Sequence, residues 1–310
     1  MAGRGMRIAT LGWKDESHTP ETWRSDIVEG LRALGHRVTY TVPFNQATRE
    51  RAKEVARDAD LVLWFKDDGF DGDYGFLRSL KERGTPSMGV HLDLFHDVPR
   101  RDLTIGQSAW WHCEYVLTAD GGQRNWGDIN HVWLPPAFGE RFLGMADPDL
   151  DEYPERVVFV GTPSERIHGE HRSALIDWAA AEFGDDFKHW GSRGAHKVWG
   201  WDLNRLYASA ELVIGDSAEA PYYWSDRVPR TLGRGGILAH PEVPGMREMG
   251  FNEDNMILYP RGEYDAIAEQ FNALTDAKKR RMRKAAVDTV RKQHTWKVRF
   301  KTTFEELGLA

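Results

Sequence analysis

A polar cluster in the last third of the chain has the residue types that bind a diphosphate. Ser225, Asp226 and Arg227 stand directly before a short helical run over residues 228–232, which ends in glycines. Backbone N–H groups at the start of a helix attract anions, and an arginine pairs with two phosphate oxygens at once. We therefore predict a diphosphate site at this point, with Arg230 as a further cation.

A carboxylate follows this cluster in the sequence. Glu248 comes shortly after the loop formed by Pro244 and Gly245. Because an ionised carboxylate accepts hydrogen bonds from hydroxyl groups, Glu248 is expected to orient a sugar or ribose hydroxyl beside the diphosphate.

A second place for phosphate lies near the middle of the chain. An apolar strand predicted over residues 156–160 ends at Gly161, and the loop after it carries Arg166. A small, flexible loop between a strand and a helix lets a phosphate approach backbone N–H groups. We predict that Gly161 and Arg166 contact the diphosphate. The alternative, that Arg166 is a solvated loop charge, stays open.

Two titratable residues stand at the end of a predicted strand in the first half of the chain. The strand covers residues 87–92, and His91 and Asp93 lie at its carboxyl end. In an open parallel sheet, ligands bind outside the carboxyl ends of the strands. We predict that Asp93 binds or deprotonates an acceptor hydroxyl, with His91 as the second candidate. The alternatives are that Asp93 caps the next segment and that His91 is a buried histidine.

Parallel strands that alternate with helices would position these residues. Residues 7–11 and 38–42 have the apolar pattern of strands, and residues 20–34 between them repeat apolar side chains at helical spacing, with Thr19 as the expected N-cap. The same alternation continues along the chain. It predicts an α/β fold class with parallel sheets.

Several segments, taken in order, resemble the CgeB-like (spore-maturation protein) branch of the GT-B glycosyltransferases. The matching segments are Ser225-Asp226-Arg227-Val228, Gly235-Gly236, Val243-Pro244-Gly245 with Glu248, LNRLYASAELV over residues 203–213, and His294-Thr295-Trp296. Together they cover most of residues 155–310. The chain departs from the family at Arg230, because the family has a glutamate three residues after the Asp-Arg pair.

The resemblance implies a GT-B type fold, in which two Rossmann-like parallel-sheet domains face a central cleft. The expected domains are an N-terminal acceptor-side domain over residues 1–145, a nucleotide-sugar-binding domain over residues 146–293, and a C-terminal helix over residues 294–310 that crosses back to the first domain. The acidic, proline-containing segment 144–155 is the predicted linker.

The resemblance also implies an activity. It is the transfer of a sugar from a nucleotide-diphosphate donor, expected to be a UDP-sugar, to an acceptor hydroxyl. Trp190 stands near the point at which the family holds the nucleotide base. Arg227, together with Arg166 and Arg230, would stabilise the charge of the leaving diphosphate, so we predict neither a metal nor another cofactor.

The composition bears on nucleic-acid binding, disulfide bonds and location in the cell. The net charge of −7 argues against a protein whose whole surface attracts nucleic acid. The single cysteine, Cys113, cannot form an internal disulfide and suits a reducing cytosol. We predict a cytoplasmic protein without a signal peptide and without membrane insertion.

Two questions stay open at the level of sequence. The acceptor is either a 5-hydroxymethylpyrimidine in duplex DNA or a protein or surface glycan. The basic helix predicted over residues 276–293 is compatible with DNA, although such a helix is more often a solvated face. Arg230 in place of the family glutamate leaves a further alternative, a non-catalytic nucleotide-binding or structural module that retains the fold.

Overall fold

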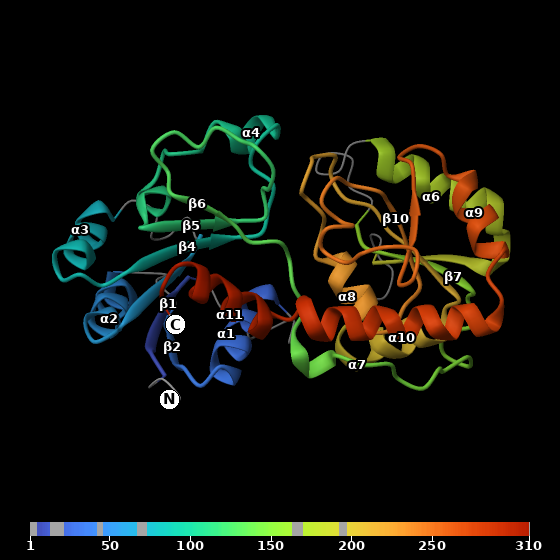
Figure 1. The fold of residues 1–310 in the computed structure, drawn as a ribbon, viewed down its shortest axis with the longest axis horizontal. Helices are drawn as coiled ribbons and strands as arrows, with labels where there is room; N and C mark the ends of the chain where they lie inside the picture. The colour runs from blue at the N-terminus through green and yellow to red at the C-terminus, as the bar shows by residue number, and fades with distance from the viewer. Residues whose placement is uncertain are drawn as a thin grey trace. The chain divides into compact units, whose positions relative to one another are not determined.

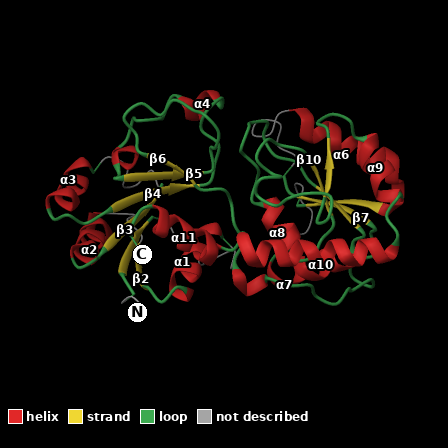
Figure 2. Cartoon of the chain, in the orientation of Figure 1, coloured by secondary structure: helices red, strands yellow, loops and turns green. Residues whose placement is uncertain are grey.

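The computed structural model describes residues 5–12, 22–41, 46–66, 73–162, 170–191 and 197–309. These residues form two compact units, each with a parallel sheet and covering helices (Figure 1, Figure 2). One unit comprises Met1–Pro135 and Trp296–Ala310, and the other comprises Pro136–Thr295. The predicted α/β fold class with parallel sheets is confirmed.

The first unit contains a six-stranded sheet in the order β2-β1-β3-β4-β5-β6, and every neighbouring pair is parallel. Its central strand β3 consists of five apolar residues that are all buried, as the two covered faces of a parallel sheet require. The strands are β1 (Arg7–Leu11), β2 (Arg37–Thr41), β3 (Leu61–Phe65), β4 (Ser87–His91), β5 (Tyr115–Thr118) and β6 (His131–Trp133).

Helices from both ends of the sequence cover this sheet. They are α1 (Trp23–Ala33), α2 (Gln46–Arg57), α3 (Tyr74–Glu82), α4 (Pro99–Asp102), the 3₁₀ helix η1 (Ala109–His112) and α11 (Trp296–Glu306). Helix α11 packs closely on α1 at Gly30. A Cβ on Gly30 would lie 2.9 Å from both the Cβ of Trp296 and the backbone nitrogen of Lys297, so a larger side chain would not fit there. The last helix of the chain therefore completes the first unit.

The second unit contains a five-stranded parallel sheet in the order β11-β10-β9-β7-β8. Its strands are β7 (Val157–Val160), β8 (Phe187–Trp190), β9 (Leu212–Ile214), β10 (Leu238–Pro241) and β11 (Ile257–Tyr259). Its helices are η2 (Glu140–Phe142), α6 (Glu170–Phe183), η3 (Gly184–Asp186), α7 (Gly200–Ser209), α8 (Arg227–Gly233), α9 (Asp265–Asn272) and α10 (Asp276–Gln293). None of the helices in the described residues is long and apolar enough to cross a membrane.

The acidic segment 144–155, which we predicted to be a linker, lies within the second unit. The units divide after Pro135 and again after Thr295. The finer boundaries expected at residues 145 and 293 stay a prediction.

The strand order of each sheet reverses direction once. In the second unit, β8 and β9 lie on opposite sides of β7, so the carboxyl ends of β7 and β9 border a topological switch point. In the first unit the same holds for β1 and β3, because β2 lies on the far side of β1. Ligands of open α/β sheets bind outside such points.

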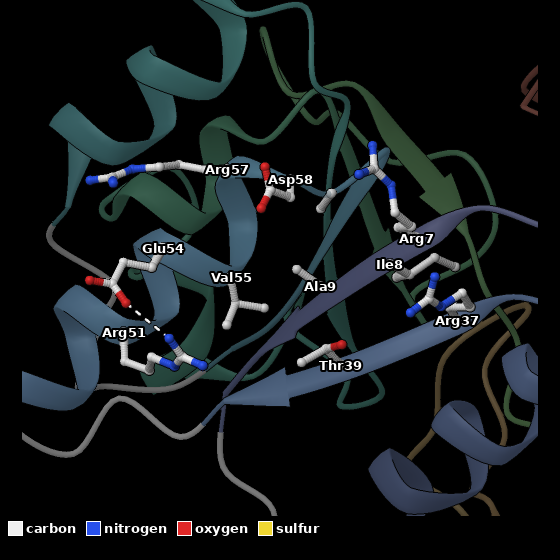
Figure 3. Close-up of a pocket in the computed structure, with 11 residues that line it drawn as sticks. Arg7, Ile8, Ala9, Arg37, Thr39, Arg51, Glu54, Val55, Arg57 and Asp58 are labelled. Atoms are coloured by element: carbon white, nitrogen blue, oxygen red, sulfur yellow. Dashed lines mark hydrogen bonds and ion pairs between the residues drawn. The ribbon is translucent and has the colours of Figure 1, made fainter.

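The first unit also has a cavity of about 470 Å³ between α2 and strands β1 and β2 (Figure 3). It includes Arg7 and Arg37, the first residues of their strands. Arg51 on its wall pairs with Glu54 at 3.1 Å, and Arg7 pairs with Asp60 at 2.8 Å. Because it includes the amino ends of the strands, this cavity is separate from the predicted site at their carboxyl ends.

Candidate functional site

Arg227 connects two strand ends at the switch point of the second unit. It is the first residue of α8, and its Nε and Nη2 both donate to the carbonyl oxygen of Val160, at 3.2 and 3.0 Å. Its Nη1 donates to the backbone oxygen and to Oδ1 of Asp216, at 3.0 and 3.2 Å. The guanidinium also lies 4.8 Å from the ring centroid of Phe159. Arg227 therefore ties the end of β7 to the segment after β9.

A buried carboxylate holds this arginine together with a second one. The Nε of Arg172 donates to Oδ1 of Asp216 at 2.7 Å, and its Nη1 donates to the carbonyl oxygen of Thr162 at 3.0 Å. Burial acts to raise the pKa of Asp216, but the charges of Arg227 and Arg172 hold it below its ordinary value. Burial, followed by the charge of Arg227, lowers the pKa of Arg172 to about 10. Two guanidinium groups and one carboxylate give the cluster one net positive charge.

A cavity of about 320 Å³ adjoins this cluster. Four predicted residues are part of its wall: Gly161, Asp226, Arg227 and Arg230. Lys197, Val198, Trp199, Leu203 and Tyr207 are among its other lining residues. The structure therefore brings together the predicted residues of two distant segments, and adds aromatic and apolar side chains beside them.

The charged side chains of this cavity favour an anion. Arg230 donates from Nη1 to Oδ2 of Asp226 at 3.1 Å, across one turn of α8. Arg227, Arg230 and Lys197 bring three positive charges to the wall, whereas Asp226 brings one negative charge. An excess of cations beside aromatic and apolar side chains is suited to a phosphate group attached to a flat ring.

Gly161 directly follows β7 and lies against Arg227. Its φ of 145° belongs to glycine, and a Cβ at this position would lie 2.4 Å from Nη2 of Arg227. Its N–H donates to the carbonyl oxygen of Trp190 at 2.9 Å, and its own oxygen accepts from Nε2 of His189 at 2.7 Å. Gly161 thus keeps the face of the guanidinium open, rather than offering a free N–H group as predicted.

Replacing Gly161 with alanine is expected to lower the free energy of unfolding by about 1–3 kcal/mol, because the new Cβ combines a strained φ with a clash against Arg227. The Cβ would also cover the guanidinium, so binding of a nucleoside diphosphate should be lost. Urea denaturation and calorimetric titration with UDP measure the two effects. Gly184→Ala is the matched control, since Gly184 has a φ of 52° and no heavy atom within 4 Å of the added Cβ. Equal UDP affinity in both variants would contradict the assignment.

The other predicted donor-site residues do not line this cavity in the described part of the chain. The hydroxyl of Ser225 donates to the backbone oxygen of Asp216 at 3.3 Å. Trp190 is buried, with Tyr153 edge-on at 5.6 Å and the ammonium of Lys188 at 4.0 Å. Glu248 accepts a hydrogen bond from the hydroxyl of Tyr222 at 3.1 Å. Arg166 lies outside the described residues.

Sequence reasoning assigned no role to four residues of the site. Asp216 follows β9 at its carboxyl end, and the rule that pointed to Asp93 would have pointed to it as well. Arg172 lies in α6, and its approach to Asp216 depends on a contact between residues 44 positions apart. Lys197 and Trp199 come after β8 in a segment with no motif, so no signal marked them.

The first unit holds the two predicted catalytic residues at the end of β4. Nδ1 of His91 accepts a hydrogen bond from the backbone N–H of Asp93 at 3.0 Å. Burial lowers the pKa of His91 to about 4, so the ring is neutral at pH 7 and carries its proton on Nε2. Oδ2 of Asp93 lies 2.6 Å from Nη2 of Arg101, and the carboxylate is about half exposed. The lone pair of His91 is occupied, which leaves Asp93 as the stronger candidate for a base.

Asp120 fixes the loop that carries Asp93. Its carboxylate is buried and accepts backbone N–H groups from Phe95 at 2.8 Å and from His96 at 3.2 Å. Burial raises the pKa of Asp120 to about 6, although these hydrogen bonds oppose the rise. The loop after β4 therefore depends on a carboxylate that titrates close to neutral pH.

Asp120→Asn is expected to change how stability depends on pH. The pKa of Asp120 in the folded protein is above its ordinary value, so protonation stabilises the fold as the pH falls from 7 toward 4. When the pH is lowered from about 7.5 to 5, the free energy of unfolding of the wild type should rise by about 1 kcal/mol relative to that of the asparagine variant. The variant lacks the carboxyl group that titrates. Urea denaturation at both pH values measures this difference. Parallel pH profiles for the two proteins would show that Asp120 does not titrate in this range.

Comparison with known proteins found a matching family and solved structures of similar fold. Residues 166–305 match the glycosyl transferase-like family. No curated protein matches the chain in sequence. A glycosyltransferase from Rickettsia africae superposes with a TM-score of 0.63 at 10% identity, covering 98% of both chains.

Two further solved structures have the same fold. Sucrose-phosphate synthase from Thermosynechococcus elongatus superposes with a TM-score of 0.58 at 13% identity, covering 98% of this chain and 99% of that one. HepE from Anabaena, in complex with UDP-glucose, superposes with a TM-score of 0.62 at 13% identity, covering 98% of this chain and 100% of that one. The predicted GT-B fold is confirmed, and the resemblance to glycosyltransferases is supported in sequence over residues 166–305. The chain has the GT-B fold and is similar to the glycosyl transferase-like family over residues 166–305.

Proposed function

We propose that this protein is a glycosyltransferase of the CgeB-like branch, which moves a sugar from a nucleoside-diphosphate donor to an acceptor hydroxyl. One observation carries the proposal. Gly161, Asp226, Arg227 and Arg230, predicted from separate segments, line one cavity beside the switch point of the second unit. The same fold in HepE binds UDP-glucose, and an Escherichia coli protein of this fold has UDP-2-fluoro glucose bound.

The cations of the cavity would act on the leaving diphosphate. A guanidinium carries five N–H groups, and Arg227 donates four of them to Val160 and Asp216. Among the described residues, one Nη2 N–H has no partner, and it lies on the side that Gly161 keeps open. Arg230 and Lys197 would add charge that is already in place when the glycosidic bond breaks. We propose that the sugar transfer needs no metal ion.

The donor's other groups would bind beside these cations. The aromatic rings of Trp199 and Tyr207, which line the cavity, are suited to the nucleotide base, in place of the buried Trp190. Ser225 would then act by fixing the backbone of Asp216, and Glu248 would meet the donor sugar. A UDP-sugar is the donor that we propose.

The acceptor hydroxyl would lose its proton to Asp93. The carboxylate lies beside Arg101 and is about half exposed, so an incoming hydroxyl can reach it. We propose as acceptor either a 5-hydroxymethylpyrimidine in duplex DNA or a protein or surface glycan, and we propose that the reaction occurs in the cytoplasm. His91 would assist as a donor through Nε2.

The alternative function is a nucleotide-binding module without catalysis. Arg230 favours it, because it replaces a carboxylate with a cation and forms an ion pair with Asp226 at 3.1 Å. Slow hydrolysis of the UDP-sugar without acceptor, measured with a chelator present, separates the two. An enzyme should release UDP under these conditions, and a binding module should not.

Binding of a nucleoside diphosphate is the first test. A ligand present at 100 times its dissociation constant should stabilise the protein by about 2.7 kcal/mol, which appears as a higher melting temperature. A thermal-shift panel of UDP, GDP, dTDP and uridine checks this, with uridine as the control that lacks phosphate. If none of the diphosphates raises the melting temperature above the uridine value, the proposed function is wrong.

A further inference from the structure

A buried carboxylate holds the backbone of the loop that carries the proposed base. Asp120 stands two residues after β5 and is 1% exposed. Its Oδ2 accepts from the backbone N–H of Phe95 at 2.8 Å, and its Oδ1 accepts from that of His96 at 3.2 Å. These two N–H groups follow Asp93 by two and three residues. Asp120 therefore fixes the course of the chain directly after the base.

The other contacts of Asp93 depend on the same loop. Its backbone N–H donates to Nδ1 of His91 at 3.0 Å, and its Oδ2 lies 2.6 Å from Nη2 of Arg101. Arg101 belongs to α4, which follows the loop, and it also donates to the carbonyl oxygen of Leu94 at 3.1 Å. The distance between Arg101 and Asp93 is thus set by the residues between them, and these are the residues that Asp120 holds.

Contacts with the sheet keep Asp120 itself in place. Its N–H donates to the hydroxyl of Thr118 at 3.2 Å, and this hydroxyl forms a hydrogen bond with Nε2 of His131 at 2.9 Å. The ring of His131 stacks on that of Trp126 at 3.9 Å. Thr118 ends β5 and His131 begins β6, so the carboxylate is anchored to two neighbouring strands.

The charged groups around this carboxylate have partners of their own. Arg124 pairs with Asp97 at 2.7 Å, and Nδ1 of His96 lies 3.4 Å from Oδ1 of Asp102. Burial lowers the pKa of His131 to about 4, so its ring is neutral at pH 7. Among the described residues the carboxylate forms no ion pair, and its role is to accept the two backbone N–H groups.

Two N–H groups at one buried position require two acceptor oxygens. An ionised carboxylate supplies both, whereas a protonated carboxyl or an amide supplies one good acceptor. Burial raises the pKa of Asp120 to about 6, against the hydrogen bonds from Phe95 and His96 and the charges of His96 and Arg124. A proton taken up near this pH would leave one of the two N–H groups without a good acceptor.

We propose that Asp120 is a positioning residue for the sugar transfer, because its ionised carboxylate holds Phe95 and His96 so that the loop presents Asp93 to the acceptor hydroxyl. The inference rests on the proposed function, since it uses Asp93 as the base. It assigns the fall of activity near pH 6 to release of the loop rather than to protonation of the base.

Hydrolysis of UDP-glucose by the full chain tests the inference without an identified acceptor, because water replaces the acceptor hydroxyl. Asp120→Asn leaves one acceptor oxygen, so it should slow UDP release at pH 7.5 roughly tenfold, as loss of a hydrogen bond to a charged group does. Asp97→Asn is the matched control, because Asp97 lies on the same loop but is 69% exposed and pairs with Arg124 alone. Its rate should equal that of the wild type. Equal rates in the two variants would overturn the inference.

A double variant shows whether Asp120 acts through Asp93. Asp120→Asn should slow UDP release roughly tenfold in the wild-type chain, and by less than about twofold in a chain that already carries Asp93→Asn. The same slowing in both chains would show that Asp120 acts independently of the base, and the inference would be wrong.

The pH dependence separates positioning from a purely structural role. Asp120 is largely ionised at pH 7.5 and largely protonated at pH 5. The ratio of the wild-type rate to that of Asp120→Asn should therefore fall from roughly tenfold at pH 7.5 to about twofold at pH 5. A ratio that does not change with pH would contradict release of the loop by protonation.

Hydrogen exchange of the wild type gives the same information if Asp120→Asn does not fold. The amides of Phe95 and His96 should be less protected at pH 5 than at pH 7.5, after correction for the intrinsic exchange rate. Equal protection at both pH values would overturn the inference.

Two readings keep the failures apart. The shift of melting temperature on adding UDP reports on the donor site in every variant, so an unchanged shift shows that Asp120→Asn remains folded. If the wild type releases UDP and Asp120→Asn releases it equally fast, the inference fails and the proposed function stands. If the wild type releases no UDP from UDP-glucose, the proposed transfer is wrong and the inference falls with it.

Discussion

Asp93→Asn should reduce the rate of sugar transfer by about 10²–10⁴-fold, while the affinity for UDP stays unchanged. Asparagine has the same shape and can still accept from Arg101, which lies 2.6 Å from the carboxylate, but it cannot take the proton of the acceptor hydroxyl. UDP binding should not change, because the proposed donor residues belong to the second unit and Asp93 to the first. Release of UDP from a UDP-sugar with acceptor present measures the rate.

Asp102→Asn is the matched control for this variant. Asp102 is also half exposed and lies 3.4 Å from the Nδ1 of His96, so the same chemical change is made nearby at a group without a proposed role. Its transfer rate should equal that of the wild type. A transfer rate for Asp93→Asn within a few-fold of the control would remove Asp93 as the base.

Arg227→Ala is expected to have the largest effect on stability, a loss of about 3–5 kcal/mol of unfolding free energy. The alanine would leave the carbonyl of Val160 without its guanidinium donor. Among the described residues, the buried Asp216 would keep Arg172 as its ion-pair partner. Stabilisation by UDP should also disappear, because the positive charge at the cavity wall is lost. Urea denaturation and thermal shift with UDP measure these two effects.

Arg247→Ala separates burial from the mere loss of an ion pair. Arg247 also contacts two carboxylates, Glu242 and Glu253, but its side chain is 48% exposed, against 12% for Arg227. An exposed pair contributes about 0–1 kcal/mol, so this variant should be nearly as stable as the wild type.

Arg227→Lys keeps the charge and should recover part of the stabilisation by UDP. Unchanged UDP binding in Arg227→Ala would show that the diphosphate binds elsewhere.

The sequence predicts a helix well when residues within the helix and at its ends determine where it begins and ends. Helix α10 has the predicted bounds, residues 276–293, because Thr275 caps it and buried Met282, Ala286 and Val290 recur at helical spacing. Helix α1 begins later than predicted, at Trp23, because the side chain of Thr22 accepts from the N–H of Ser25 and caps it there. The predicted cap at Thr19 lies outside the described residues.

The site could be predicted only in part, because its partners come from distant segments. Arg227 was recognisable as a cation beside a helix start, yet its contact with Val160 joins residues 67 positions apart. That contact follows from β7 and β9 being neighbours, which no local pattern encodes. For Trp190 the prediction from its position near the strand end does not agree with the cavity lining. The residue was expected near the nucleotide base, but its side chain is buried.

The position of helix α11 has a consequence for how the protein is made. Helix α11 packs against Gly30 of α1, so this face of α1 stays uncovered until Trp296–Glu306 has been synthesised. The second unit is continuous in sequence and can finish first during synthesis. A nonsense codon just after Thr295 would therefore leave the second unit whole and remove α11 from the first.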